Sequence, residues 1–414
     1  MLRKGKVLLF LGSLLVVIYG ASVSFTGKDA FRELAVFMDV LHKIRNDYVE
    51  VPDMNNVQEG AMRGLISALD PYSSFLTRSQ YDELQKRREQ AAASAGMVLS
   101  RRAEVIYVVS CKPGGPAEQA GVRPGDYIIA VNGQGVENKS ILEVDSLLRG
   151  PEGTRSTITL FRRFQTQPHE VEITYRRSAS DQVRAEMLDG NTGYLRIISF
   201  KDPTAERVKK ELNALIAAGA RAILLDLRDC AEGSQADAAV VANYFIRSGI
   251  IYFTQNRHKE RIEVVEAKPE LFITDLPLAV LINSSTAGAA EILAGAVKDH
   301  GRGRVIGENS FGTGSVQKTI SLKSGSVLIL STAKFCTPNG KIIQEESVRT
   351  TGIAPDIVVP DDKKRQDLAA EFAELTDEQD ELRYRQIQEI IRNIQLDAAL
   401  DLLLKESKTE KKAA

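Results

Sequence analysis

The sequence predicts a multidomain protein of mixed α+β and α/β class, with a helical N-terminal segment, a small β-rich module, an α/β core and a C-terminal helix. Its 414 residues suit two to three domains. Short strands alternate with turns over residues 95–177, and near-continuous apolar strands alternate with helices over residues 183–360. An apolar content of 43% with 26% charged residues is ordinary for a globular protein. The predicted boundaries are 1–28, 29–92, 93–178, 179–362 and 363–414.

The first segment, residues 1–28, has the pattern of a signal anchor or a signal peptide. Arg3, Lys4 and Lys6 precede an uncharged run over residues 7–25. As a helix, residues 7–23 would extend about 25 Å, against a hydrocarbon core of ~30 Å. A cleaved signal peptide is the alternative, although the small residues of YGASVS form no clear cleavage site. Either way we expect the rest of the chain to be exported and the basic flank of the first segment to stay in the cytoplasm. The expected location is the cell envelope, with an anchor in the inner membrane and the body in the periplasm or extracytoplasmic space.

Residues 29–92 read as helices. Leu34, Phe37, Met38, Leu41 and Ile44 recur at helical spacing. A second helix over NNVQEGAMRGLISALD stops at the Asp-Pro pair of residues 70–71, and RSQYDELQKRREQ is a third, highly charged one.

The β-rich module, residues 93–178, contains the strands EVIYVVS, DYIIAVNG, STITLFRR and EVEITYRR and one short helix over residues 141–148. In the next region, TGYLRIISF, AILLDLR and LPLAVLIN each precede a helix. This alternation predicts an α/β sheet covered on both faces. The tail carries apolar residues at helical spacing, which suits packing on the body or on a second subunit.

Composition excludes several classes of function. The formal net charge is −1, so no basic excess points to nucleic acid. Three scattered cysteines (Cys111, Cys230, Cys336) and four scattered histidines show no metal-ligand spacing and no disulfide framework. We therefore expect neither a metal nor a cofactor.

The run PGGPAEQAGVRPGDYIIAVNGQGV, residues 113–136, closely resembles the core of a PDZ domain. The resemblance implies binding of an extended peptide beside a strand edge, with a loop of backbone N–H groups holding the terminal carboxylate. It places the carboxylate loop at residues 95–98 and the helical wall of the groove at residues 141–148. The implied peptide-binding residues are Gly96, Met97, Val98, Leu99, Leu142, Leu147 and Leu148. A PDZ fold used only as a spacer or clamp is the alternative.

Residues 31–360 resemble the C-terminal processing peptidases, the tail-specific serine proteases of family S41. The stretches that carry the resemblance, in the family's order, are ALDPYSSFLT (68–77), GYLRIISF (193–200), ILLDLR (223–228), AEILAGAVKDHGRGRVIGENSFGTGSVQ (290–317) and TPNGKIIQ…GIAPDIVV (337–359). The resemblance implies a ClpP/crotonase-like α/β core. It also implies a Ser–Lys dyad, in which a desolvated lysine is the base, a glutamine orients it, and backbone amides form the oxyanion hole.

The chain departs from this pattern at the dyad itself. In NSSTAGAAE, residues 283–291, the positions Asn283, Ala287, Ala289 and Glu291 match the family, but the nucleophile position is Gly288. In FGTGSVQ, residues 311–317, the base position is Thr313, while Gln317 is retained. The separation of the two positions is that of the family, so no gap has shifted the frame. The acidic position represented by Asp299 is also retained.

The oxyanion loop departs as well. After LDLR the family has NNPGG, whereas this chain has Asp229-Cys230-Ala231-Glu232-Gly233. Glu232 replaces the first glycine, so the altered oxyanion positions are Glu232 and Ala289, and a carboxylate at residue 232 would repel developing negative charge.

The sequence therefore predicts a pseudopeptidase that binds protein C-termini and acts as an adaptor or regulator, because glycine cannot be acylated and threonine is not basic near neutral pH. One alternative is an active endopeptidase that uses displaced residues. Ser284, Ser285, Ser310, Ser315 and Cys230 are the nucleophile candidates, and Lys298 and Lys318 the bases. Another is a structural scaffold with an unoccupied PDZ groove. The resemblance further implies self-association, or pairing with an active relative, through the terminal helices.

Overall fold

The structure is a computed structural model that describes residues 34–102, 105–162, 165, 167–177, 182–201, 203–344, 351–360, 362–373 and 381–413. The predicted anchor or signal peptide lies outside these residues. Within them, no helix combines the length and apolar character needed to cross a membrane. The chain divides into two compact units, residues 1–65 and 66–414, which are described separately.

The first unit contains a helix over residues 34–47 and most of α2 (Met54–Ser67), as the periodicity predicts. Its apolar residues are largely exposed: Leu34 is 54% and Met38 56% accessible.

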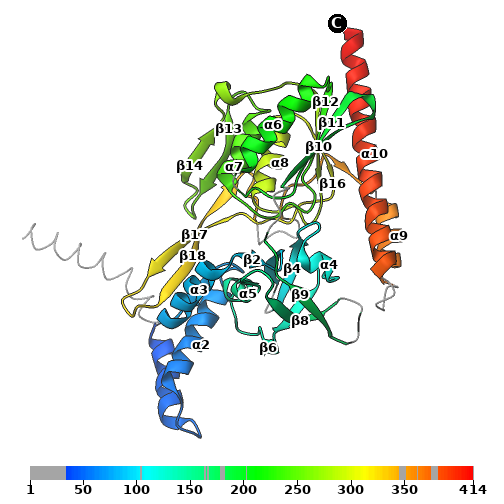
Figure 1. Cartoon of the computed structure of the whole chain (residues 1–414). Helices are drawn as coiled ribbons and strands as arrows, with labels where there is room; N and C mark the ends of the chain where they lie inside the picture. Colours follow the sequence, from blue (N-terminus) through cyan, green and yellow to red (C-terminus); the bar gives the residue numbers. More distant parts are fainter. Residues whose placement is uncertain are drawn as a thin grey trace, which may run out of the picture. The chain divides into compact units, whose positions relative to one another are not determined.

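The β-rich module folds as predicted, around an antiparallel sheet in the order β3 (Met97–Arg102), β4 (Val105–Cys111), β5 (Tyr127–Val131), β8 (Arg155–Phe161) and β9 (His169–Thr174). The short strand β6 (Gln134–Gly135) pairs with β5, and β2 (Ala93–Ser94) pairs with β7 (Arg149–Gly150). Two helices, α4 (Pro116–Gln119) and α5 (Ile141–Leu147), complete the module. Strand β3 is the end strand of this sheet and α5 packs beside it. Figure 1 labels β4, β8, β9, α4 and α5 of this module.

The α/β core has a six-stranded sheet in the order β10 (Val183–Leu188), β11 (Thr192–Ile197), β12 (Ala222–Asp226), β15 (Leu278–Ile282), β16 (Arg304–Gly307) and β19 (Ile357–Val358). All neighbours are parallel except β10 and β11. A short 3-10 turn (Asp189–Asn191) joins β10 to β11.

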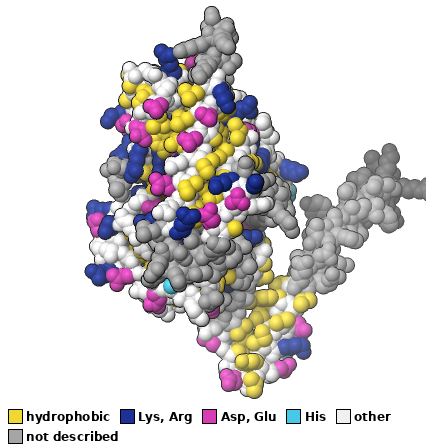
Figure 2. Space-filling model, turned by 90° about the vertical axis from the view of Figure 1, so that its right-hand side faces the viewer, with side chains coloured by type: hydrophobic (Ala, Val, Ile, Leu, Met, Phe, Trp, Pro, Cys, Tyr) yellow, Lys and Arg dark blue, Asp and Glu magenta, His cyan; other side chains and the backbone are white. Residues whose placement is uncertain are grey.

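Both faces of this sheet are covered, which explains the near-continuous apolar strands. On one face Ile223 and Leu225 pack into a core formed with α6 (Thr204–Ala217), α7 (Gln235–Asn243) and α8 (Ala289–Asp299). On the other face Leu224 packs with Ala399 and Leu403 of α10 (Glu381–Ala413). The tail therefore packs on the body of its own chain, one of the two arrangements expected, with α9 (Asp362–Ala373) preceding it. Figure 2 faces this side of the molecule and shows apolar side chains among basic and acidic ones.

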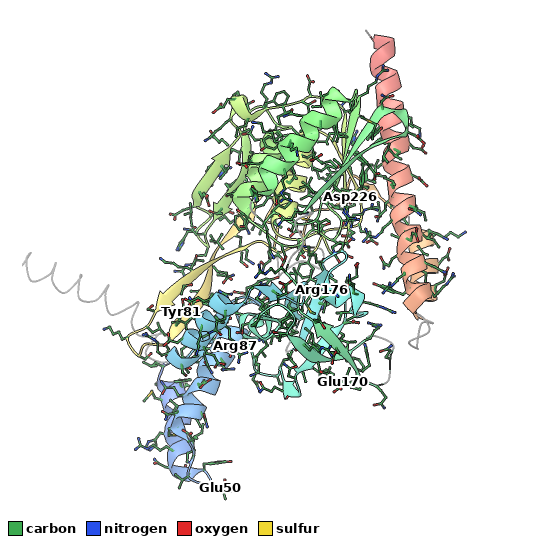
Figure 3. The ribbon with its side chains drawn as sticks, in the orientation of Figure 1. Glu50, Tyr81, Arg87, Glu170, Arg176 and Asp226 are labelled. Carbon is green, nitrogen blue, oxygen red and sulfur yellow. The ribbon has the colours of Figure 1, made fainter. Side chains whose placement is uncertain are left out.

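A second, antiparallel sheet was not predicted. Its order is β1 (Ser74–Leu76), β18 (Val327–Cys336), β13 (Ile250–Gln255) and β14 (Arg261–Glu266), with β17 (Ser315–Ser321) also paired to β18. A 3-10 turn (Pro269–Leu271) follows β14. Helix α3 (Arg78–Gln90) begins at a capping box between Thr77 and Gln80 and packs Leu84 against this sheet; its Tyr81, labelled in Figure 3, joins the same cluster.

Candidate active site

The segment that matches the family's nucleophile motif forms the turn between β15 and α8. Gly288 is the N-cap of α8 with φ 60° and ψ −113°, a region that residues with side chains rarely adopt. A Cβ built on Gly288 would meet no atom within 4 Å. The sharp turn is thus present, and open space lies where a nucleophile would project.

Glu291 of α8 connects this turn to the loop that carries the base position. Its buried carboxylate accepts hydrogen bonds from the backbone N–H of Gly288 and Thr313, at 2.8 Å each, and from Gly312 at 2.6 Å. The hydroxyl of Ser310 donates to Oε1 of the same carboxylate, the oxygen that also accepts from Gly312. Burial raises the pKa of Glu291 to about 7, while the four donors, Ser310 foremost, act in the opposite direction.

Thr313 points its hydroxyl at a tyrosine from a distant part of the chain. The Oη of Tyr72 lies 3.1 Å from Thr313 Oγ1 and 3.2 Å from Ser100 Oγ of β3. Burial raises the pKa of Tyr72, so this hydroxyl stays protonated at neutral pH. The base position is therefore occupied by a neutral hydroxyl network that reaches the end strand of the β-rich module.

That module contacts all the other parts of the candidate site. Ser285 Oγ donates to the carbonyl of Val109 at 2.8 Å, and Ser110 Oγ donates to the carbonyl of Asp229 at 3.0 Å. The ring of Tyr107 lies 6.2 Å from that of Phe311. Strand β4 thus lies against the nucleophile segment, the oxyanion loop and the base loop together, while Ser100 of β3 reaches the base loop through Tyr72.

The loop that follows β12 is fixed by Asp229, a non-glycine residue with φ 62°. Asn283 Nδ2 donates to its Oδ1 at 2.8 Å, while the guanidinium groups of Arg392 and Arg196 contact its Oδ2. Its backbone N–H donates to Asn283 Oδ1 at 3.0 Å. Through Asp229, this loop therefore contacts β11 of the sheet, the nucleophile segment and α10.

Glu232 does not extend freely into the site. Its carboxylate lies 2.7 Å from Lys201 Nζ, and its carbonyl accepts from the N–H of Phe200. The next residue, Gly233, has φ 124°, and a Cβ there would come within 2.2 Å of the Phe200 backbone. This close approach admits only glycine.

The other predicted site residues lie around this centre in structural roles. Ala289 is buried in the first turn of α8. The retained Gln317 is exposed on β17 and donates to Ser331 Oγ at 2.9 Å. Asp299 accepts the backbone N–H of Asn339 at 2.8 Å. No contact joins either of these two side chains to Thr313 among the described residues.

The expected peptide-binding residues lie at β3 and α5. Gly96, with φ 76°, precedes β3, and Met97 and Leu99 point into the core of the module. Val98 is half-buried between them. On α5 and just after it, Leu147 and Leu148 pack on that core, whereas Leu142 packs against Leu76 and Leu84 of the neighbouring cluster. Their role in binding a peptide stays a prediction.

A buried ion pair between Asp226 and Arg228 lies at the start of the loop that follows β12. Asp226, at the end of β12 and labelled in Figure 3, accepts from Arg228 Nε at 2.9 Å and from Nη2 at 2.7 Å. Tyr194 Oη donates to the same carboxylate at 2.7 Å. Burial alone would raise the pKa of Asp226, but the charge of Arg228 outweighs it and lowers that pKa. Arg228 Nη1 also donates to the carbonyl of Arg392 and to Gln395 Oε1 on α10.

Sequence reasoning missed Tyr72, Asp229 and Arg392 as members of this site. Tyr72 lies within a stretch that matches the family, and Asp229 within the altered loop, but their partners are far away along the chain. No group of three or more His, Cys, Asp or Glu side chains among the described residues is arranged to hold a metal ion.

Comparisons with known proteins agree with this architecture. The family description "Peptidase family S41" matches residues 191–359 and "PDZ domain" matches residues 107–162. The carboxy-terminal-processing protease of Bartonella bacilliformis is 32% identical over 354 residues, covering 84% of this chain and 80% of that protein. The carboxy-terminal processing protease CtpA of Bacillus subtilis is 31% identical over 335 residues, covering 80% and 70%.

A solved structure shows the same fold. The photosystem II D1 C-terminal processing protease superposes with a TM-score of 0.67 at 25% identity, over 81% of this chain and 88% of that one. The predicted architecture of helices, PDZ domain, α/β core and C-terminal helix is confirmed. With its S41 core and PDZ domain, this chain belongs to the C-terminal processing proteases of peptidase family S41.

Proposed function

We propose that this family member is a pseudopeptidase of the cell envelope that binds protein C-termini through its PDZ domain and acts as an adaptor or regulator. One observation carries the proposal: the turn and the loop of the dyad are both formed, yet they present Gly288 and Thr313. Loss of the nucleophile or the base in a serine protease lowers turnover on the order of 10⁶-fold.

Three of the four neighbouring serine hydroxyls donate to other groups and the thiol is buried, which supports inactivity; Ser284 is exposed. Ser285 is buried and donates to Val109, Ser310 donates to Glu291, and Ser315 donates to Gln344 Oε1 at 2.7 Å. Cys230 is fully buried, and burial raises the pKa of its thiol well above the ordinary value.

The candidate lysines support the same conclusion. Lys298 Nζ contacts Asp356 at 3.3 Å and the carbonyl of Ala354. Lys318 is exposed on β17. Lys112, which was not among the candidates, points the other way: burial lowers its pKa, as a base would need, and its charged neighbours are Lys201 and Glu232. The test below therefore includes Lys112→Met.

Peptide binding is supported by the position of β3. It is an end strand beside a helix, the arrangement in which an added peptide strand finds unpaired backbone groups. We expect protein C-termini to bind at this edge, with Gly96 in the loop that holds their terminal carboxylate.

The proposal is tested by attempted restoration of the dyad. The protein is incubated with a peptide that has a free apolar C-terminus, and cleavage is followed by mass spectrometry. We expect no cleavage by the native chain and measurable cleavage after Gly288→Ser with Thr313→Lys, or after the further change Glu232→Gly. The matched control is Gly288→Ala with Thr313→Met, which adds similar bulk without the chemistry.

Two results would overturn parts of the proposal. Cleavage by the native chain that disappears in Ser285→Ala, Cys230→Ala or Lys112→Met would show an active enzyme with displaced residues. For binding, amide resonances of residues 96–99 are observed during titration with the free-acid peptide and its C-terminal amide. Silence with a diverse peptide set would show a scaffold instead of an adaptor.

A further inference from the structure

A cavity of about 400 Å³ lies between the PDZ domain, the α/β core and α10. It borders the candidate active site through Asp229 and Arg392, and none of the predicted peptide-binding residues lines it. Val122 and Arg123 of the PDZ domain form one wall, Arg196 of β11 the second, and Tyr384 and Arg392 of α10 the third. Its volume falls in the range of about 300–1,000 Å³ typical of small-molecule sites.

The core wall of this cavity carries an arginine whose donors are not satisfied. Arg196 has only 15% of its side chain exposed, and its Nε and Nη2 atoms are buried without a hydrogen-bond acceptor. Its nearest carboxylate oxygen, Asp229 Oδ2, lies 3.5 Å away and is already contacted by Arg392. Because buried guanidinium donors without an acceptor are costly, Arg196 favours an additional oxyanion.

Guanidinium groups lie on all three walls of the cavity. Four guanidinium groups line it, those of Arg123, Arg196, Arg385 and Arg392. Three carboxylates oppose them. Asp229 is shared by two arginines, Glu118 accepts the N–H of Gly114 at 2.6 Å, and Glu389 is exposed on α10.

The remaining surface is suited to an apolar group. The guanidinium carbon of Arg123 lies 3.9 Å from the ring centroid of Tyr384, so the two form a flat stacked wall. Val122, Pro113 and Pro124 continue this surface. Gln119 lies at the rim, where it accepts from Arg176 Nη1 at 3.1 Å; Arg176 is labelled in Figure 3.

We propose that this cavity is a binding site for a small amphipathic anion, a carboxylate or phosphate monoester with an apolar chain. The oxyanion contacts Arg196 and Arg392, and the apolar part lies against Val122 and the Arg123–Tyr384 stack. A ligand held there touches all three walls at once. Binding therefore stabilises the docking of the PDZ domain and α10 on the core, and it raises the unfolding temperature by an amount that grows with the logarithm of the ligand concentration above Kd.

The experiment uses the full chain and three probes of one chain length: hexanoate, hexyl phosphate and the neutral hexanamide. Binding is measured by ligand-observed saturation-transfer NMR and by the shift of the unfolding temperature. We expect both anions to bind and hexanamide to bind at least about tenfold more weakly, since one charge-assisted hydrogen bond accounts for that factor. The tighter of the two anions identifies the headgroup class.

Three variants locate the site. Arg196→Gln is expected to weaken anion binding about tenfold or more, and Gln388→Trp, which fills the cavity from α10 without altering charge, is expected to abolish it. The matched control is Arg304→Gln, an exposed arginine on β16 of the same sheet, which should leave binding unchanged.

The proposal is overturned if neither anion binds at millimolar concentration, or if hexanamide binds as well as hexanoate. It is also overturned if the anions bind Arg196→Gln and Gln388→Trp as they bind the native chain. None of these readouts depends on peptidase activity or on the PDZ groove, so they stand apart from the test of the proposed function.

Discussion

The backbone N–H groups of Gly288 and Thr313 donate to the same oxygen, Oε2 of Glu291, each at 2.8 Å. The two positions at which family relatives are expected to carry the dyad are therefore still joined through one buried carboxylate. The backbone at both positions is held by the same hydrogen-bond acceptor, although the side chains there offer neither a nucleophile nor an amine base.

The first prediction concerns the pH dependence that Glu291 imposes. Its pKa is about 7 in the folded chain against an ordinary value of 4.5, so the folded state binds the proton more tightly. This contribution to the free energy of unfolding is fully present below pH 4.5 and is lost as pH rises through 7. We expect the difference between the native chain and Glu291→Gln to shrink over this range by up to about 1.4 kcal/mol per pH unit. Urea unfolding from pH 4 to 8 measures it.

The control for this experiment is Glu186→Gln, an exposed glutamate on β10, whose difference from the native chain should be flat over the same range. A flat difference for Glu291→Gln as well would contradict the assignment.

The second prediction concerns the hydroxyl bridge between Tyr72 and Thr313. Tyr72→Phe and Thr313→Val each remove one partner of the 3.1 Å contact, and Tyr72→Phe also leaves Ser100 without it. A double-mutant cycle should show a coupling of about 0.5–1.5 kcal/mol in the free energy of unfolding. Tyr72→Phe combined with Ser324→Ala, an exposed turn position, should show additive effects. If the effects of Tyr72→Phe and Thr313→Val are additive, the hydrogen bond between the two hydroxyls does not contribute to the free energy of unfolding.

The third prediction concerns the buried pair Asp226–Arg228, whose side chains are 0% and 4% exposed. Arg228→Met leaves the carboxylate of Asp226 buried with less compensation, and it should lower the free energy of unfolding by about 3–5 kcal/mol. Asp226→Leu in the Arg228→Met background should restore part of that loss, because neither charge of this pair then remains buried. Chemical denaturation of the two single variants and the double variant decides this. A double variant that is less stable than Arg228→Met would contradict it.

The fourth prediction concerns the docking of α10 on the sheet. Leu403 is 1% exposed and packs with Leu224 and Ala399, whereas Ile390 on the same helix is 40% exposed. Leu403→Ala should lower the free energy of unfolding by about 2–4 kcal/mol, and Ile390→Ala by less than about 1 kcal/mol. Equal small effects would indicate that α10 does not pack on its own core.

Much of the fold follows from local pattern. The strands at residues 222–226 and 278–282 are apolar at nearly every position because they are covered on both faces, and α3 begins where its charged segment begins. The positions Gly288 and Thr313 were found from the resemblance of two segments to the family's motifs, because both motifs are short and continuous in the chain.

The second sheet and the contacts of the site were not predictable in this way. Strands β14 and β17 are largely exposed and carry mixed residues, so their pattern is weak, and β1 pairs with β18, far away along the chain. The partners of Asp229 come from β11, the nucleophile segment and α10. A single sequence contains no signal that joins such distant residues.

The open space above Gly288 has a genetic consequence. A glycine codon of suitable third base becomes a serine codon by one substitution, and a threonine codon becomes a lysine codon equally easily. Packing raises no barrier to the change from Gly288 to serine, so among structural factors only the backbone conformation opposes it, and populations carrying this gene should be screened for alleles with serine at that position.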